Sequence, residues 1–279
     1  MGAVSDFSTE LIGEPGEVDR VRIEIGAGRV EIVPTDGDRT QVRIDVENGT
    51  EDDLRYKLSG SELVVETTKN QRRGPEVHVV IQTPDVLAAR IKTGSGDISA
   101  RATLGESRLS TGSGDIRIER VEGTLAAGTG SGDIRIEHAA GAVRANTGSG
   151  TIDIEQADGQ LALSTGSGDV RVGDATGPTT VKVGSGDITI ERIRDHSVAT
   201  SGSGDVRVEL ADGPSVRAET ARGDVQIGVP DGVPTYLDLK TVTGHIQCDL
   251  EPGEQPAEGE RSLILRARTV SGDITVVRA

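Results

Sequence analysis

Aromatic residues and cysteine are nearly absent from this chain of 279 residues. It contains no tryptophan, two tyrosines, one phenylalanine and a single cysteine, Cys248. One cysteine excludes an intrachain disulfide, and the scarcity of large side chains argues against a thick conventional core. We interpret Cys248 as a small core residue, because it alternates with Ile246 and Leu250 on the inward face of an expected strand.

Basic clusters, targeting segments and long apolar runs are also missing. The net charge of −16 disfavours nucleic acid as a partner, because phosphate contacts need clustered lysine and arginine. No apolar run approaches the roughly 18 residues of a membrane span. Met1 to Glu10 lack the basic and apolar regions of a signal peptide, so we expect the protein to stay in the cytoplasm, with envelope association left open.

No residue arrangement typical of catalysis is visible. The four histidines, His78, His138, His196 and His245, are scattered and lack metal-ligand spacing. Parallel β-helices that cleave polysaccharides need a carboxylate cluster and usually aromatic platforms for sugars, and this chain has no tryptophan. We therefore predict that the protein is not an enzyme and has no catalytic residue and no cofactor.

Glycine, in contrast, is abundant and periodic. The string G-S-G-D, once replaced by G-S-G-T, recurs at a fixed step of 18 residues. The glycines that open these corners are Gly94, Gly112, Gly130, Gly148, Gly166, Gly184 and Gly202. Two apolar residues follow each corner, as Ile116 and Ile118 do, and a weaker pair such as Leu125 and Ala127 follows nine residues later. Each repeat therefore contains two short strands with one buried face.

This repeat predicts a parallel β-solenoid, because glycine-rich turns between such short strands leave no room for helices. Successive coils should stack about 4.8 Å apart. Corner glycines allow positive φ and close approach of the next coil, and nearby Thr and Ser hydroxyls can bond the turn backbone. The fold class is thus an all-β, single-stranded parallel β-helix with 18-residue coils. We expect it to be right-handed, since right-handed crossovers dominate parallel sheets.

The chain divides into three expected regions. Residues 1–17 carry little pattern and are predicted to be a flexible leader. Residues 18–89 alternate like strands but have irregular turns, which predicts an irregular β-rich N-terminal cap over the first coil. Within them, Gly26 to Ile32 resembles a worn corner motif. Residues 90–279 should form the solenoid, with regular coils over 90–213 and irregular coils with longer loops over 214–279.

The last expected strand, Ile274 to Val277, runs almost to the C-terminus. An exposed strand edge is a template for pairing with another chain. This edge is therefore either bare or in contact with another molecule, so the expected partner is an unknown protein or a second copy bound through the C-terminal coil.

The corner aspartates should form a column that Thr151 interrupts. Its members are Asp97, Asp115, Asp133, Asp169, Asp187, Asp205 and Asp224. Like charges about 4.8 Å apart repel by about 1 kcal/mol in water, so something must offset the repulsion. One option is a ladder of Ca²⁺ ions, as in solenoids with a nine-residue repeat. The option we favour is hydrogen bonding from Ser and Gly amides of the same or the next corner.

Outward strand positions alternate in charge. The arginines are Arg117, Arg135, Arg171 and Arg207, and the glutamates are Glu119, Glu137, Glu155, Glu191 and Glu209. We interpret this checkerboard as a solvated, self-compensating face that discourages aggregation. A binding surface for a charged partner is the alternative.

The recurring S-G-D-I corner and the lead-in V-H-V-V-I-Q-T-P from Val77 to Pro84 resemble the bacterial adhesin-type β-strand-repeat family, domain of unknown function 4097. The resemblance covers roughly Val18 to Ala279. It implies a single-stranded parallel β-helix, often found in bacterial envelope proteins, and it transfers no catalytic or binding residue. The adhesin label also implies export, from which this chain departs because no signal peptide is visible.

The sequence therefore predicts a non-enzymatic β-solenoid that acts as a scaffold or protein-interaction module. The alternative is an adhesin-like envelope or surface binding protein. A calcium-dependent solenoid is a lesser alternative.

Overall fold

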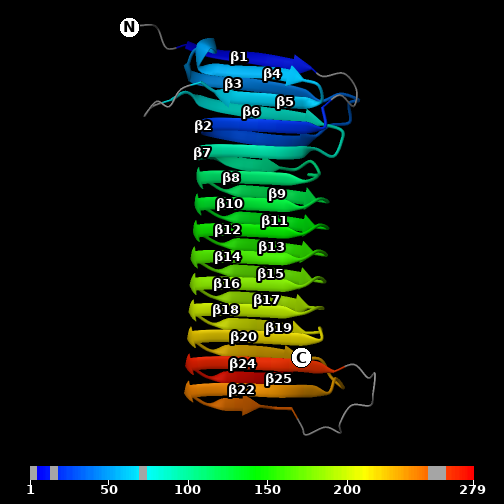
Figure 1. Cartoon of the computed structure of the whole chain (residues 1–279), viewed down its shortest axis with the longest axis vertical. Helices are drawn as coiled ribbons and strands as arrows, with labels where there is room; N and C mark the ends of the chain where they lie inside the picture. Colours follow the sequence, from blue (N-terminus) through cyan, green and yellow to red (C-terminus); the bar gives the residue numbers. More distant parts are fainter. Residues whose placement is uncertain (1–4, 13–17, 69–73, 251–261) are drawn as a thin grey trace. The chain divides into compact units, whose positions relative to one another are not determined.

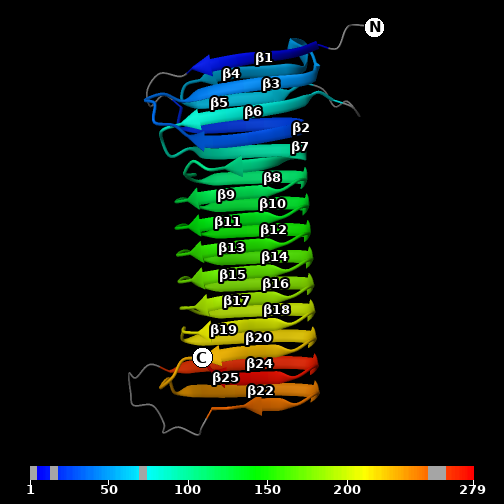
Figure 2. The ribbon, with the colours of Figure 1, turned by 180° about the vertical axis from the view of Figure 1, so that it is seen from behind.

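A computed structural model describes residues 5–12, 18–68, 74–250 and 262–279 of the chain. The chain divides into two compact units, Met1–Gly141 and Ala142–Ala279. Both units consist of β-strands joined by tight turns (Figures 1 and 2), and the described residues contain no α-helix.

The first unit holds eleven strands and one short 3-10 helix within its described residues. They are β1 (Ser5–Ile12), β2 (Arg20–Pro34), β3 (Gln41–Gly49), η1 (Glu51–Asp53), β4 (Leu54–Ser59), β5 (Glu62–Thr67), β6 (Glu76–Thr83), β7 (Ala88–Ala100), β8 (Ser107–Ser113), β9 (Ile116–Val121), β10 (Leu125–Ser131) and β11 (Ile134–Ala139).

The described part of the second unit contains strands only. They are β12 (Val143–Ser149), β13 (Ile152–Ala157), β14 (Leu161–Ser167), β15 (Val170–Ala175), β16 (Thr179–Ser185), β17 (Ile188–Ile193), β18 (Ser197–Ser203), β19 (Val206–Ala211), β20 (Ser215–Arg222), β21 (Val225–Val229), β22 (Thr235–Thr243), β23 (Ile246–Cys248), β24 (Leu263–Ser271) and β25 (Ile274–Arg278).

Strand register confirms the 18-residue coil. In the first unit, Ile134 lies opposite Ile116 in a parallel pair. In the second unit, Val170 lies opposite Ile152, and β17 and β19 continue that ladder. Each coil contributes one strand to each of two ladders, as the nine-residue half-step predicts. The fold is therefore a single-stranded parallel β-helix. Its right-handed coiling stays a prediction.

Each coil has a thin apolar interior and a corner that only glycine fits. Ile116 and Ile118 are buried, as are their counterparts in other coils. Gly114 has a φ of 147°, and a Cβ there would lie 2.3 Å from the carbonyl oxygen of Gly96. The hydroxyl of Thr111 donates to that same carbonyl at 3.0 Å. This bond, which recurs along both units, satisfies a buried polar side chain next to the turn.

The N-terminal region contains a true first coil, β2. Gly28 lies opposite Gly96 and Val30 opposite Ile98, which confirms the worn corner motif. On its other side, β2 pairs with β5 along its first half and with β6 along its second. Antiparallel strands extend this cover, because β4 pairs with β5 and β3 with β6.

The flexible leader predicted for residues 1–17 is wrong over Ser5–Ile12. This segment is β1, which pairs antiparallel with β3 and places Thr9 opposite Ile44. Phe7, Thr9 and Leu11 alternate as half-buried residues, a period of two that suits a strand packed on one face. Residues 1–4 and 13–17 lie outside the described part of the chain.

The order of coils in the second unit differs from their order in the sequence. Strand β24 pairs with β20 on one side and β22 on the other, and β25 lies likewise between β21 and β23. The predicted bare or partner-bound strand at Ile274–Val277 is therefore wrong. Its corner, Ser271-Gly272-Asp273, keeps the regular motif, whereas the β22–β23 corner has His245 in place of aspartate.

The coil formed by β22 and β23, here called the open coil, pairs on one side only among the described residues. Cys248 lies opposite the buried Val276, so it occupies an inward position as predicted. It is nevertheless exposed. The prediction of a core cysteine is wrong, because among the described residues no further coil covers this position.

Candidate interaction surfaces

The corner aspartates form a hydrogen-bonded column in each unit. In the first unit, the amide N–H of Asp115 donates to Oδ1 of Asp97 at 2.9 Å, and Asp133 repeats the bond to Asp115. In the second unit the same bond links Asp187 to Asp169, Asp205 to Asp187, Asp224 to Asp205, Asp273 to Asp224 and His245 to Asp273, at 2.8 to 3.0 Å. The donor to each carboxylate is the backbone amide of the equivalent corner residue in the adjacent coil, an aspartate or, once, His245, rather than the Ser or Gly amides that the sequence suggested.

In two of these corners the second carboxylate oxygen binds arginine. Arg117 donates to Oδ2 of Asp115 at 2.5 Å, and Arg171 donates to Oδ2 of Asp169 at 3.2 Å. In each pair the arginine follows the corner aspartate by two residues and lies on the next strand. A carboxylate that accepts from an amide on one oxygen and a guanidinium on the other is compensated without a metal ion. The calcium ladder at Asp97, Asp115, Asp133, Asp169, Asp187 and Asp205 stays a prediction that chelation followed by thermal melting tests.

The predicted corner glycines stack in columns within each unit. A Cβ at Gly112 would meet the carbonyl oxygen of Gly94 at 2.5 Å, and one at Gly130 would meet that of Gly112 at the same distance. In the second unit Gly166, Gly184 and Gly202 each approach the preceding corner glycine, beginning with Gly148, equally closely. These residues are structural, because the next coil leaves no space for a side chain.

Outward charges form columns, here called the outward stripes, in which like charges meet in the first unit and opposite charges in the second. Arg135 lies directly opposite Arg117 in the parallel ladder of the first unit, whereas Arg171 lies opposite Asp153 in the second. Arginine charge is also offset along the chain, by Asp115 for Arg117 and by Glu209 for Arg207, whose ion pair spans 3.5 Å. Exposed pairs of this kind contribute about 0–1 kcal/mol each, so the stripes shape the surface more than they stabilise it.

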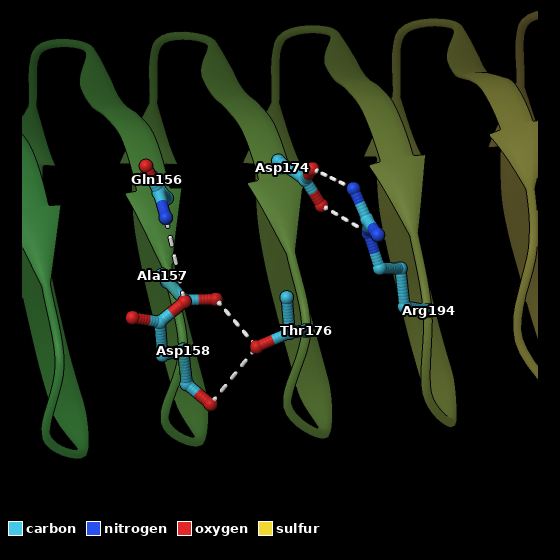
Figure 3. Close-up of polar contacts among 6 residues, drawn as sticks. All are labelled: Gln156, Ala157, Asp158, Asp174, Thr176 and Arg194. Atoms are coloured by element: carbon cyan, nitrogen blue, oxygen red, sulfur yellow. Dashed lines mark hydrogen bonds and ion pairs between the residues drawn. The ribbon is translucent and has the colours of Figure 1, made fainter.

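The opposite end of the same strands carries a second set of polar contacts in the second unit (Figure 3). Arg194 binds Asp174 of the neighbouring coil through two hydrogen bonds, of 2.9 and 2.5 Å. This bidentate contact raises the pKa of the Arg194 guanidinium. The Thr176 hydroxyl reaches the carbonyl oxygens of Ala157 and Asp158 at 3.5 and 3.2 Å. These contacts tie adjacent coils together.

The open coil presents the most apolar exposed surface of the second unit. Its exposed side chains include Tyr236, Leu237, Val242 and Ile246, with exposed fractions of 51%, 40%, 76% and 46%. Residues of β22 also line a shallow groove with Arg268 and other residues of β24 and β20. Exposed apolar residues gathered on a strand that is paired on one side only mark an interaction site.

Charged residues lie among these apolar ones. Asp238 binds Arg268 of β24 at 3.0 Å and Lys240 of its own strand at 3.3 Å. The hydrogen bond from Arg268, followed by that from Lys240, holds the pKa of Asp238 below its usual value. The open coil therefore carries one negative and one positive side chain two residues apart on its outward face.

One cluster of potential metal ligands was not predicted from the sequence. Among the described residues, a single group of three potential metal ligands lies within 4.8 Å, formed by Glu47, Glu76 and His78. The antiparallel pair of β3 and β6 brings Glu47 opposite Glu76. No periodic signal in the sequence predicts that pairing, so these histidine and glutamate positions looked unrelated. Their side chains are exposed or half-buried, which is common for such residues without a metal.

The described part of the chain contains no helix that is long and apolar enough to cross a bilayer.

Comparison with known proteins gives one family and several solved folds. The family model described as Toastrack DUF4097 matches residues 18–277. A candidate adhesin from Bacteroides fragilis is 12% identical, with 98% of each chain covered and a TM-score of 0.45. A candidate adhesin from Parabacteroides merdae is 12% identical, covering 82% of this chain and 94% of its own, with a TM-score of 0.45.

A third solved structure is a candidate lipid binding protein from Parabacteroides distasonis. It is 11% identical, with 97% of each chain covered and a TM-score of 0.39. Among curated proteins the sequence has no match.

Proposed function

Since this chain belongs to the Toastrack DUF4097 family, for which no catalytic activity is indicated, we propose that it is a non-enzymatic β-solenoid that serves as a protein-interaction module. The observation that carries this proposal is the open coil, whose strands have one edge without a partner among the described residues and whose apolar side chains are exposed. The stacked coils provide a rigid support for that surface.

Physical chemistry supports binding through this coil. An unpaired strand offers a row of free N–H and C=O groups, which a partner strand can satisfy by extending the sheet. Apolar side chains such as Tyr236 and Val242 lose contact with water when a partner covers them, at about 25 cal/mol per Å². Both contributions are absent from the outward stripes, whose charges are already compensated.

The experiment is affinity capture of partners from native lysate with the full chain, compared between two single variants. Val242→Asp places a charge on the open coil. Val198→Asp is the matched control, because Val198 is an exposed valine on the outward side of β18 in the same unit. We expect a partner that Val198→Asp retains and Val242→Asp loses. A partner retained by both variants, or no partner at all, contradicts the proposal.

Attachment at a bacterial surface is the alternative role for the same coil. The names of two proteins of similar fold suggest it, since both are described as candidate adhesins. We propose a cytoplasmic location instead. Fractionation of cells that make the protein decides between them, because recovery from the cell wall or medium favours the adhesin-like role.

A further inference from the structure

Strand β22 of the open coil, which has one unpaired edge among the described residues, is nearly symmetric about its centre. Its sequence T-Y-L-D-L-K-T-V-T has Leu239 in the middle and Thr235 and Thr243 at its ends. Asp238 and Lys240 flank the centre with opposite charges. A strand that is self-complementary in this way can pair with a second copy of itself.

Side-chain direction along β22 is fixed by its partner β24. Leu237 and Leu239 lie opposite Leu265 and Ala267, which are buried. The odd-numbered residues of β22 therefore face the interior, and the even-numbered ones, from Tyr236 to Val242, face outward. A register that keeps inward residues opposite inward residues extends both the interior and the outer surface.

We propose that two copies of this chain associate through β22, as an antiparallel pair whose two-fold axis passes through Leu239. The proposal rests on the interaction role proposed above and names its partner. It places Asp238 opposite the partner's Lys240, and by symmetry Lys240 opposite the partner's Asp238. It also places Tyr236 opposite the partner's Val242 and Thr235 opposite the partner's Thr243.

Each of these contacts belongs to a class that stabilises antiparallel sheets. Opposite-charge pairs, aromatic pairs with β-branched residues, and Thr–Thr pairs each contribute about 0.2–1 kcal/mol. Inward, Leu239 meets the partner's Leu239, and Leu237 meets the partner's Thr241. This contact covers Leu237, which is 40% exposed in the single chain, and it makes the interface isologous, as closed dimers require.

Charge selects this register over its neighbours. Centring the pair on Asp238 sets two carboxylates opposite each other, and centring it on Lys240 does the same for two ammonium groups. A shift by one residue turns every inward side chain outward. Only the pairing about Leu239 sets Asp238 opposite Lys240 and also keeps inward side chains opposite inward side chains.

Charge variants of the full chain test the pairing by sedimentation equilibrium over a wide concentration range. Lys240→Asp sets carboxylates opposite carboxylates at two places, so we expect the dimer to weaken about tenfold or more. Asp238→Lys alone does the same with positive charges. Mixing the two variants restores both opposite-charge pairs, and we expect a heterodimer of near wild-type affinity.

A cross-link tests the register independently of charge, in a Cys248→Ser background. Leu239→Cys lies opposite its own symmetry mate, at a Cα separation of about 4.5–5.5 Å that suits a disulfide. Thr241→Cys is the matched control, because its symmetry mate lies four residues along the strand, about 13 Å away. We expect an oxidised dimer from the first variant only.

A monomer at every concentration together with no cross-link from Leu239→Cys overturns the proposal, and so does equal cross-linking by both cysteine variants. Capture of a different protein by wild type and by Lys240→Asp alike would leave the interaction role standing while the dimer fails. The cross-link retains its meaning if Asp238→Lys disturbs folding near Arg268.

Discussion

The first coil of the first unit and the open coil of the second unit differ in how far their inward side chains are buried. In β2, the inward residues Val21 and Val30 are 1% and 0% exposed. At equivalent inward positions of the open coil, Leu237 and Ile246 are 40% and 46% exposed. Both coils are built from the same alternating pattern, so the difference comes from what lies on top of them.

The covering strands of β2 come from elsewhere in the chain. Strands β5 and β6 pair with β2 directly, and β3 and β4 extend the layer antiparallel. Antiparallel strands end a parallel stack because they break the repeat that another coil could continue. The described residues of the second unit hold no such layer over β22 and β23. A coil without a cover keeps its capacity to pair, which is why we assign the interaction to it.

Truncating one inward side chain in each coil should give the largest contrast. Ile23 of β2 is 1% exposed, so Ile23→Ala should cost about 2–5 kcal/mol of unfolding free energy by removing buried methyl groups and leaving a cavity. Leu237→Ala should cost less than about 1 kcal/mol, because its side chain is partly solvated before the change. Urea unfolding of dilute protein measures both, and equal losses would contradict the difference in cover.

Glycine substitutions within β2 test the contact between this coil and the strands that cover it. Gly28 has a φ of 122°, and a Cβ there would lie 2.0 Å from the carbonyl oxygen of Val77 in the covering strand. Gly28→Ala should therefore destabilise the first unit by about 2–3 kcal/mol. Gly26 on the same strand has no atom within 4 Å of such a Cβ.

Gly26→Ala is thus the matched control, and it should leave the unfolding midpoint within error of wild type. A comparable loss from both variants would mean that backbone freedom, rather than the layer over β2, makes glycine necessary there.

Much of this fold follows from the period of the sequence. The step of 18 residues predicts which isoleucines stack, and the register of Ile134 opposite Ile116 agrees. The corner of β2 was also visible, because Gly28 keeps its place relative to Val30. Periodic positions are predictable because each coil meets the same surroundings as the last.

The departures lie where pairing is not periodic. The local sequence around Phe7, Thr9 and Leu11 does not predict that they lie against β3. The insertion of β24 between β20 and β22 depends on which coil matches the corner motif better. A signal for the latter existed in the aspartate at position 273 and the histidine at position 245. The Glu47, Glu76 and His78 cluster had none, because its strands pair antiparallel across a long connection.

The smallest expected effect concerns pH at the outer edge of the covering layer, where β1 pairs with β3. A hydrogen bond from Ser8 of β1, followed by one from Arg43, lowers the pKa of Asp45 below its usual value. A carboxyl group whose folded pKa is lowered stabilises the fold above its unfolded pKa of about 3.9, and that stabilisation is lost as pH falls through the folded value. We therefore expect β1 amides to lose hydrogen-exchange protection below about pH 4, after correction for intrinsic rates. Asp45→Asn, which cannot titrate, should abolish this acid-dependent loss, and the same loss in both proteins would show that Asp45 does not hold β1 in place.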